Sequence, residues 1–219
     1  WRGEDVLFNG VSTDSRTVGR GDLFVALSGE KFDGHKFIVG AKERGAVAAM
    51  INVGARQASP ANPLPEQQPD IPLIQVKDTR LGLGQLAAHW RGRFNLPLVA
   101  VTGSNGKTTV KEMIASILRQ AVHGTDGTNS ADAVLATEGN LNNDIGVPQM
   151  LLRLRAQHAY AVIEMGMNHT GEIAYLTGLA RPTVALVNNA GTAHLEGLGS
   201  VEAVARAKGE IFAGLDQQG

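Results

Sequence analysis

The segment from Leu96 to Thr109, with the sequence LPLVAVTGSNGKTT, limits the possible folds more than any other stretch of this chain of 219 residues. Its apolar first half contains two valines and is typical of a buried parallel strand. Gly103 and Gly106 then indicate a tight loop. Beyond the loop, apolar residues recur at the spacing of one helix face, so a helix is predicted to begin near Lys107. The residues expected on that face are Val110, Met113, Ile114, Ile117 and Leu118.

This order of strand, glycine loop and helix suits the binding of a phosphate group. The loop aims free backbone N–H groups and the positive end of the helix dipole at one point. Lys107 adds a full positive charge, and the Thr108 hydroxyl lies where P-loop proteins place a magnesium ligand. The match to the pattern G-x-x-x-x-G-K-[ST] is incomplete, because residue 101 is a valine. The residues favour a phosphate site over the alternative of a purely structural strand, turn and helix.

Composition restricts the classes of function. The formal net charge is −1, so no basic excess indicates nucleic acid. The absence of cysteine excludes a disulfide scaffold and a thiolate metal site. No apolar run approaches the roughly 20 residues of a membrane-spanning helix. Because the chain begins without methionine and ends at Gly219, soon after the last expected helix, we expect it to be part of a longer protein.

An N-terminal α/β unit is expected before residue 78. The pattern predicts one helix at Lys36–Arg44 and four strands at Val6–Val11, Asp22–Leu27, Ala46–Ile51 and Leu73–Val76. The proline-rich stretch Asn52–Pro72 indicates an irregular excursion. Asp78 and Thr79 can cap a helix that runs toward Phe94, and the domain boundary is placed near Asp78.

Between the first two strands lies the polar stretch Ser12-Thr13-Asp14-Ser15-Arg16. Its hydroxyls, carboxylate and arginine could bind the phosphates or the uracil edge of a nucleotide. The alternative is an Asx or Ser turn with a solvated arginine. From these residues alone the alternative is favoured.

Polar residues follow the strands predicted in the second half of the chain. Strands are expected near Val134, at Ala159–Ile163 and at Pro182–Val187, and helices at Gln149–Leu154, from Thr170 or Gly171, and at Val201–Phe212. Glu164 ends the second strand, where ligands of parallel sheets bind, so it could hold magnesium; a helix-capping glutamate is the alternative. His194 lies past the third strand and could join Glu164 and Thr108 around a metal. Lys208 by itself would be a solvated lysine.

Two further polar stretches remain open at this point. Residues 138–148 contain three asparagines and an aspartate within five positions, which suits either surface turns or a grip on a substrate above a sheet. Residues 124–130 indicate a turn-rich connection. No function is assigned to this second stretch.

Four segments together resemble the Mur ligases of bacterial peptidoglycan synthesis, namely residues 101–109, 139–148, 164–173 and 205–212. The similarity covers nearly the whole chain, including residues 13–16 and 21–27 at its front. It implies an α/β protein with a small N-terminal α/β domain for the UDP end of the substrate and a P-loop-type central ATP domain with a mostly parallel sheet. We expect the first domain at residues 1–78, the second, incomplete, at 79–219, and the C-terminal domain of the family to be absent from this sequence.

The same resemblance implies roles for individual residues. ATP would be bound by Gly103, Ser104, Asn105, Gly106, Lys107, Thr108 and Thr109. Thr108 and Glu164 would bind one Mg²⁺. His194 and a carbamylated Lys208 would serve a second, and with Lys107 they would form the catalytic set. Contacts to uridine diphosphate are implied for Ser15 and Arg16, and contacts to the sugar-peptide for Asn140, Asn168 and His169.

The segment Asn140–Pro148 selects one reaction within the family. It resembles the member that joins D-alanyl-D-alanine to UDP-N-acetylmuramoyl-tripeptide. The implied chemistry is phosphoryl transfer from ATP to the peptide carboxylate, followed by attack of the dipeptide amine on the acyl phosphate. A cytoplasmic monomer that binds neither nucleic acid nor membranes is also implied. Residues 1–219 alone are not expected to form a peptide bond.

Other functions are kept as alternatives. A tripeptide-forming Mur ligase or an enzyme like folylpolyglutamate synthetase would share the ATP site and differ in the first domain. A non-catalytic nucleotide-binding module would leave Glu164, His194 and Lys208 unexplained. A switch GTPase would need an N-K-x-D segment, and the sequence contains no Asn-Lys pair.

Overall fold

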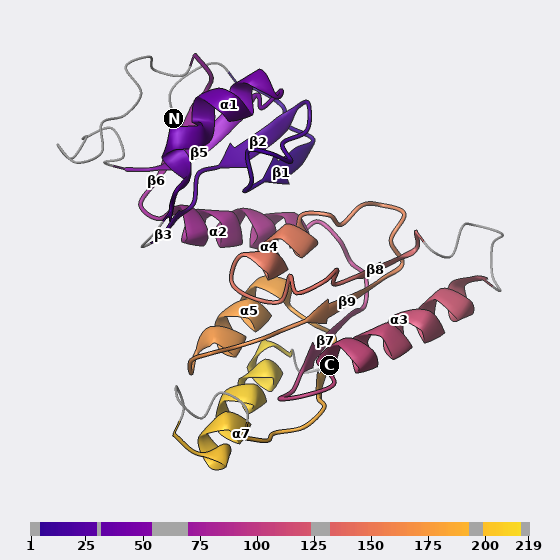
Figure 1. Cartoon of the computed structure of the whole chain (residues 1–219). Helices are drawn as coiled ribbons and strands as arrows, with labels where there is room; N and C mark the ends of the chain where they lie inside the picture. The colour runs from indigo at the N-terminus through magenta and orange to yellow at the C-terminus, as the bar shows by residue number, and fades with distance from the viewer. Residues whose placement is uncertain (1–4, 30–31, 54–69, 124–131, 193–198, 216–219) are drawn as a thin grey trace. The chain divides into compact units, whose positions relative to one another are not determined.

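The structure, a computed structural model, describes residues 5–29, 32–53, 70–123, 132–192 and 199–215 (Figure 1). Helices and strands alternate along the chain and both main sheets are parallel, so the predicted α/β class is confirmed. The chain divides into two compact units, Trp1–Gln85 and Leu86–Gly219. The boundary proposed near Asp78 stays a prediction. In the parts of the chain given above, no helix is long and apolar enough to cross a membrane.

The first unit is built on a parallel sheet in the order β1-β2-β5-β6. Its strands are β1 (Gly10–Ser12), β2 (Asp22–Val25), β5 (Ala48–Asn52) and β6 (Leu73–Val76). The other elements are the antiparallel pair β3 (Ser28–Gly29) and β4 (Phe32–Asp33), the 3-10 turn η1 (Gly34–Phe37), the helix α1 (Ile38–Glu43) and the start of α2 (Thr79–Arg91). Phe24 and Ile51 of the sheet pack with Ile38 and Ala41 of α1 and form its core.

The first predicted strand is wrong over most of its length. Residues 6–9 have no regular structure, and Leu7 is 97% exposed. The strand begins only at Gly10, which lies in register with Asp22. Because β1 and β2 are parallel and Gly10 pairs with the first residue of β2, the residues before Gly10 extend past the start of that strand and have no strand partner in the described structure.

The second unit contains a parallel sheet in the order β10-β7-β9-β8. Its strands are β7 (Leu98–Thr102), β8 (Val134–Ala136), β9 (Tyr160–Glu164) and β10 (Val184–Val187). Its helices are α3 (Lys107–His123), α4 (Gly146–Leu151), α5 (Glu172–Ala180) and α7 (Val201–Gly209), which continues into the 3-10 turn η2 (Glu210–Gly214). Each element lies within a few residues of its predicted position.

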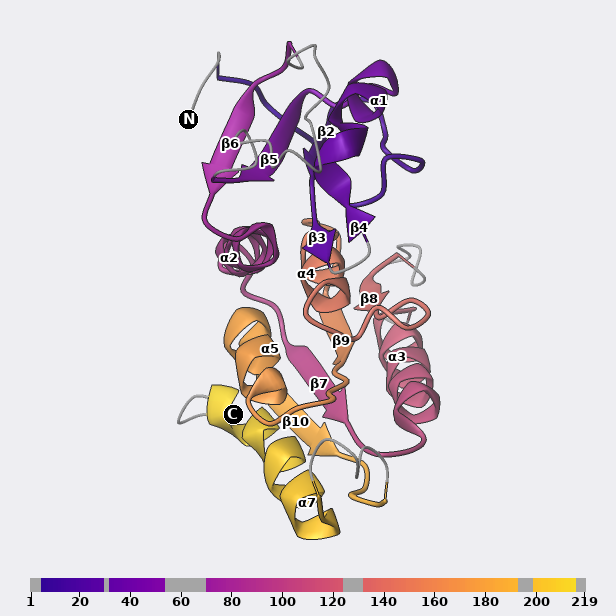
Figure 2. The same cartoon turned by 60° about the vertical axis from the view of Figure 1, so that its left-hand side comes forward.

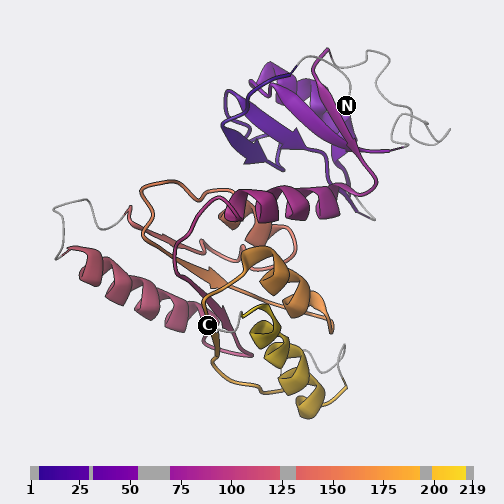
Figure 3. The same ribbon diagram turned by 180° about the vertical axis from the view of Figure 1, so that it is seen from behind.

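Helices cover both faces of this second sheet. Figure 2 shows α3 on one side of β7 and α5 on the other, and Figure 3 shows the same arrangement from behind. Leu98 and Ile163 face α4 and α5, whereas Val101 and Val162 face α3, because side chains alternate along a strand. Because β10, β7 and β9 are parallel neighbours, their carboxyl ends lie together at one edge of the sheet, where parallel sheets bind ligands.

The buried face of α3 agrees only in part with the one that apolar spacing predicts, because Val110, Ile114 and Leu118 pack against the core but Met113 and Ile117 do not. Met113 is 60% exposed and Ile117 is 68% exposed, whereas Lys111 is 1% exposed and Ala115 is fully buried. The Lys111 ammonium donates to the carbonyl oxygen of Thr137 at 2.7 Å and to the carboxylate of Glu112. Because its ammonium is satisfied in this way, the methylene stem of the lysine can occupy a core position.

Candidate nucleotide and metal site

The loop between β7 and α3 has the tight geometry that its glycines predict. Gly106 has a φ of 73°, in the left-handed region that favours glycine. At Gly103, an added Cβ atom would lie 3.0 Å from the Cβ atom of Asn188. Glycine at this position therefore lets the loop pack directly against the chain that follows β10.

Free donors gather at the start of α3. Within the described residues, the backbone N–H groups of residues 106–109 have no acceptor, and the first helical bond runs from Val110 N to Gly106 O. The Lys107 ammonium turns back over the loop and donates to Gly103 O at 2.8 Å. Four unpaired donors, an ammonium group and the N-terminus of a helix of 17 residues together form a site for an anion.

A buried carboxylate lies beside this loop. Glu164 is the last residue of β9 and is 2% exposed. Its Oε2 accepts a hydrogen bond from Thr108 Oγ1, and its Oε1 accepts one from Asn142 Nδ2, both at 2.8 Å. Its backbone N–H donates to Thr137 Oγ1 at 2.8 Å. The structure thus joins Thr108 and Glu164, which are 56 positions apart in the sequence.

The surroundings of Glu164 suit a divalent cation. No cationic side chain of the described residues pairs with this carboxylate, although burial of an unpaired charge is unfavourable. The described residues contain no group of three or more His, Asp or Glu side chains that could hold a metal. Mg²⁺ fits such a sparse set, since it keeps several waters and is commonly bound through one or two carboxylates and substrate phosphates.

Lys208 is buried on α7 and is 1% exposed, so the interpretation as a solvated lysine is wrong. It forms no hydrogen bond or ion pair with any residue that the structure describes. Burial, helped by the positive charge of Lys107, lowers the pKa of Lys208 to about 8. A much larger fraction of this amine is therefore uncharged near neutral pH than in an ordinary lysine.

The other residues singled out from the sequence are placed as follows. His194 lies outside the described residues. Asn140 is exposed, and its carbonyl oxygen accepts from Asn142 N at 2.7 Å. The N–H groups of Asn168 and His169 both donate to Glu172 Oε2, at 2.6 and 3.2 Å. Glu172 thereby closes the turn before α5, and the substrate contacts suggested for these residues stay predictions.

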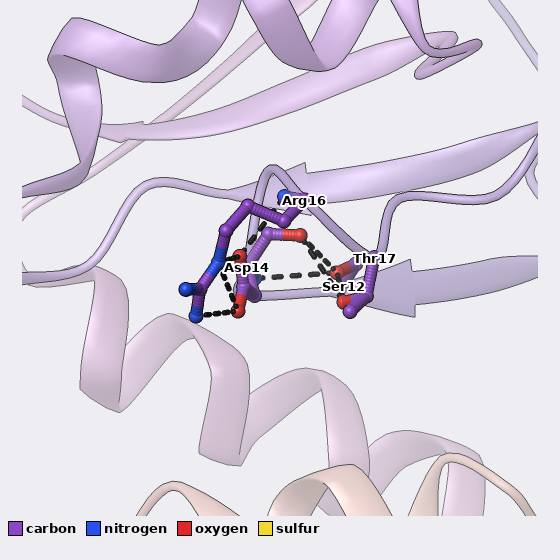
Figure 4. A network of polar contacts seen from close by, with 4 residues as sticks. All are labelled: Ser12, Asp14, Arg16 and Thr17. Atoms are coloured by element: carbon purple, nitrogen blue, oxygen red, sulfur yellow. Dashed lines mark hydrogen bonds and ion pairs between the residues drawn. The ribbon is translucent and has the colours of Figure 1, made fainter.

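In the first unit, the stretch after β1 forms an Asx turn (Figure 4). Asp14 Oδ1 accepts from the backbone N–H of Arg16 at 2.9 Å, and the carboxylate also pairs with the guanidinium, with 2.6 Å between Arg16 Nη2 and Asp14 Oδ2. The Arg16 side chain is 84% exposed. Ser12 Oγ donates to Asp14 O at 2.9 Å and braces the turn. Only Nε and Nη2 of Arg16 donate to the Asp14 carboxylate, so within the described residues Nη1 is left to donate to a phosphate while the pair stays intact.

This pair has a measurable signature. Hydrogen bonds from the side chain and backbone of Arg16 lower the pKa of Asp14 to about 2. We expect Arg16→Ala to raise that pKa toward the usual aspartate range, because the guanidinium donors are lost. Carboxyl carbon shifts followed by NMR during acid titration would measure it. Thr17→Ala is the control, since Thr17 bonds the Asp14 carbonyl and Ser12 Oγ but not the Asp14 carboxylate. An unchanged midpoint in Arg16→Ala would contradict the pairing.

Comparison with known families decides the classification. Residues 101–219 match the Mur ligase middle domain, and residues 7–91 match the Mur ligase family, catalytic domain. The chain belongs to the Mur ligase family. The middle-domain match begins in β7 and contains Glu164, Lys208 and the loop between β7 and α3, which we call the phosphate loop.

Members of this Mur ligase family resemble the chain over almost its whole length. The UDP-N-acetylmuramoyl-tripeptide--D-alanyl-D-alanine ligase of Escherichia coli (strain K12) is 50% identical over 218 residues, which is 100% of this chain and 43% of that protein. The enzyme of the same name from Bacillus subtilis (strain 168) is 40% identical and covers 99% of this chain and 43% of its own length. The chain thus spans less than half the length of these relatives.

Solved Mur ligase structures have the same fold. MurF from Acinetobacter baumannii superposes with a TM-score of 0.79 and 43% identity, over 95% of this chain and 42% of that one. MurF ligase from Thermotoga maritima, solved in complex with ADP, superposes with a TM-score of 0.77 and 32% identity, over 98% of this chain and 45% of that one. These relatives are therefore the same kind of Mur ligase as the one that the sequence of this chain resembles.

Several residues of this Mur ligase site were missed in the sequence. Asn142 and Thr137 hold Glu164, and Asn188 and Asn189 contact the phosphate loop. A signal was present for the last two, because they directly follow the strand β10 at the edge of the sheet that binds ligands. Asn142 lay inside a polar segment whose individual residues could not be ranked from sequence.

Proposed function

We propose that this chain is the uridine-nucleotide-binding and ATP-binding part of a ligase that joins D-alanyl-D-alanine to UDP-N-acetylmuramoyl-tripeptide. The observation that carries the proposal is the buried Glu164 carboxylate, bonded to Thr108 beside the free donors of the loop. It is supported by relatives that match nearly the whole chain and are named for that reaction. We place the enzyme in the cytoplasm as a monomer that binds neither nucleic acid nor membrane.

The phosphate loop would bind the triphosphate of ATP. The N–H groups of residues 106–109 lack acceptors in the described structure and would donate to phosphate oxygens. The Lys107 ammonium would leave Gly103 O and turn to the phosphates, where it would offset charge that develops during phosphoryl transfer. Ser104, Asn105 and Thr109 complete the proposed ATP site.

Thr108 and Glu164 would hold Mg²⁺ at the end of β9. When bound, the ion would supply positive charge between anionic ATP and the anionic carboxylate of the tripeptide. Asn142 keeps one oxygen of Glu164 fixed while Thr108 contacts the other. The carboxylate is therefore held in place before any ion arrives.

Lys208 would carry a carbamate. The reaction with carbon dioxide needs an uncharged amine, and burial of Lys208 beside the charge of Lys107 favours that form. The nitrogen lone pair would attack carbon dioxide, and the amine would lose a proton. The resulting anion would serve a second metal ion together with His194.

The first unit would bind the uridine end of the substrate, with Ser15 and Arg16 as contacts. Asn140, Asn168 and His169 are proposed contacts to the sugar-peptide. The γ-phosphoryl group would pass to the tripeptide carboxylate, and the D-alanyl-D-alanine amine would then attack the acyl phosphate and release phosphate. Exclusion of water from this intermediate is required, because hydrolysis would waste it.

Calorimetry with different ligands would test this assignment. We expect UDP-N-acetylmuramoyl-tripeptide to bind the chain more tightly than either shorter UDP-muramyl peptides or folate, because the proposed contacts serve both the uridine and the peptide. Arg16→Ala should weaken binding of the UDP compounds and leave ATP binding unchanged. Preference for a shorter muramyl peptide would favour a tripeptide-forming ligase. Preference for folate would favour a folylpolyglutamate synthetase-like enzyme.

A further inference from the structure

We infer that Asn189, in the loop after β10, is a positioning residue that holds the phosphate loop in its binding conformation. The inference rests on the proposed ATP site. It concerns how that site is kept open, and it assigns a function to a residue that contacts no nucleotide in the proposal above.

The Asn189 carboxamide binds both sides of one stretch of the loop. Its Oδ1 accepts from the N–H groups of Ser104 and Asn105, at 3.1 and 3.0 Å. Its Nδ2 donates to Asn105 O at 2.9 Å. The Asn189 carbonyl oxygen also accepts from Ser104 N at 3.1 Å. One side chain thus fixes the N–H and the C=O of Asn105, and rotation of that residue would break both contacts.

The neighbours of Asn189 strengthen this connection. Asn188 Nδ2 donates to Asn105 O at 2.7 Å, and Gly191 N donates to Ser104 Oγ at 2.9 Å. We call these contacts of Asn188, Asn189 and Gly191 with the loop the clamp. Because Asn188 N is bonded to Thr102 O at 2.9 Å, the clamp directly continues the pairing of β10 with β7. The loop is therefore anchored to the sheet on the β10 side as well as through its own strand.

This clamp divides the donors of the loop into two sets. Asn189 takes the N–H groups of Ser104 and Asn105, whereas the next four N–H groups, of residues 106–109, remain free in the described structure. A loop of small and polar residues has many accessible conformations, and fixing it before a ligand arrives removes that entropic cost from binding. Asn189 therefore raises affinity for the triphosphate by preorganising the donors.

Titration of ATP into the chain, unchanged and with Asn189→Ala, tests the inference. We expect the substitution to weaken ATP binding about tenfold, equivalent to roughly 1.4 kcal/mol. Asn188→Ala should have a smaller effect, since Asn105 O keeps its bond from Asn189. Gln120→Ala, at an exposed position of α3, is the control and should bind ATP like the unchanged chain.

Amide exchange measured by NMR separates positioning from general destabilisation. In Asn189→Ala the Asn105 amide loses its acceptor and should exchange about tenfold faster, whereas the Val110 amide, bonded to Gly106 O, should be unchanged. Equal or tighter ATP binding by Asn189→Ala would overturn the inference alone. Faster exchange throughout the second unit would also overturn it. Failure of the unchanged chain to bind ATP would contradict the proposed function itself, and the inference with it.

Discussion

Lys107→Ala is expected to lower the turnover of a full-length ligase that contains this sequence by at least about 10²-fold. The Lys107 ammonium lies over the loop, bonded to Gly103 O, and it is the positive side chain at the start of α3 beside the four free N–H groups. Charge on the transferred phosphoryl group spreads over its oxygens in the transition state, so loss of this cation raises the barrier more than it weakens substrate binding. Steady-state rates of phosphate release would measure the effect.

The fold should survive the Lys107 substitution, because among the described residues its ammonium bonds only to the loop carbonyl oxygens of Gly103 and Ser104. Circular dichroism and the melting temperature provide that check. Lys36→Ala, at an exposed lysine of the first unit, is the matched control and should keep normal turnover. Near-normal phosphate release by Lys107→Ala would show that the ATP site has been assigned to the wrong loop.

The backbone of this site was predictable because its signals are local. The two valines indicate a strand, the two glycines a turn, and the apolar spacing that follows a helix. The elements β7 and α3 lie close to where these signals place them. Asp78 was expected to start a helix, and its Oδ1 accepts from Arg80 N at 2.7 Å and Leu81 N at 3.0 Å. A cap is decided by neighbours two and three positions away, so sequence is sufficient.

Burial on α3 was only partly predictable, because it also depends on the rest of the unit: Val110, Ile114 and Leu118 pack against the core as expected. Apolar spacing put Met113 and Ile117 on the same face as their apolar neighbours, yet both are mostly exposed and Lys111 is buried. The acceptor that makes burial of Lys111 tolerable is Thr137 O, 26 positions away and directly after β8. Residue type alone ranks lysine as a surface residue, and only the tertiary partner reverses that ranking.

The polar contacts of Glu164 likewise depend on tertiary packing and are only partly predictable from the sequence. Its position at the end of a buried strand was readable from sequence, and so was the Thr108 hydroxyl at a helix start. The sequence did not show that Asn142 would supply the second hydrogen bond. Several asparagines lie in the same segment, and their rotamers depend on the turn before α4. The sequence thus predicts which edge of the sheet binds ligands, and packing selects which amide faces the carboxylate.

Lys208→Ala in a full-length ligase that contains this sequence should abolish most activity, and acetate or formate should restore part of it. Lys208 is buried, has no partner among the residues that the structure describes, and has its pKa lowered to about 8 by burial and by the charge of Lys107. The uncharged amine therefore becomes common as the pH rises toward 8, and the carbamate that it forms would supply an anion. Alanine removes that anion and leaves a space that a small carboxylate can fill.

The comparison with Lys208→Met identifies the cause of any rescue. Methionine removes the amine but fills most of the lysine's volume, so a carboxylate has no room and activity should stay lost. Potassium chloride at matched ionic strength controls for a salt effect. In carbon-dioxide-depleted buffer the unchanged enzyme should slow and recover when bicarbonate is added, because the proposed carbamate would be in equilibrium with carbon dioxide. Equal rescue of both variants would contradict the carbamate, and so would unchanged kinetics without carbon dioxide. Lys208 would then act as an amine or only as a packed side chain.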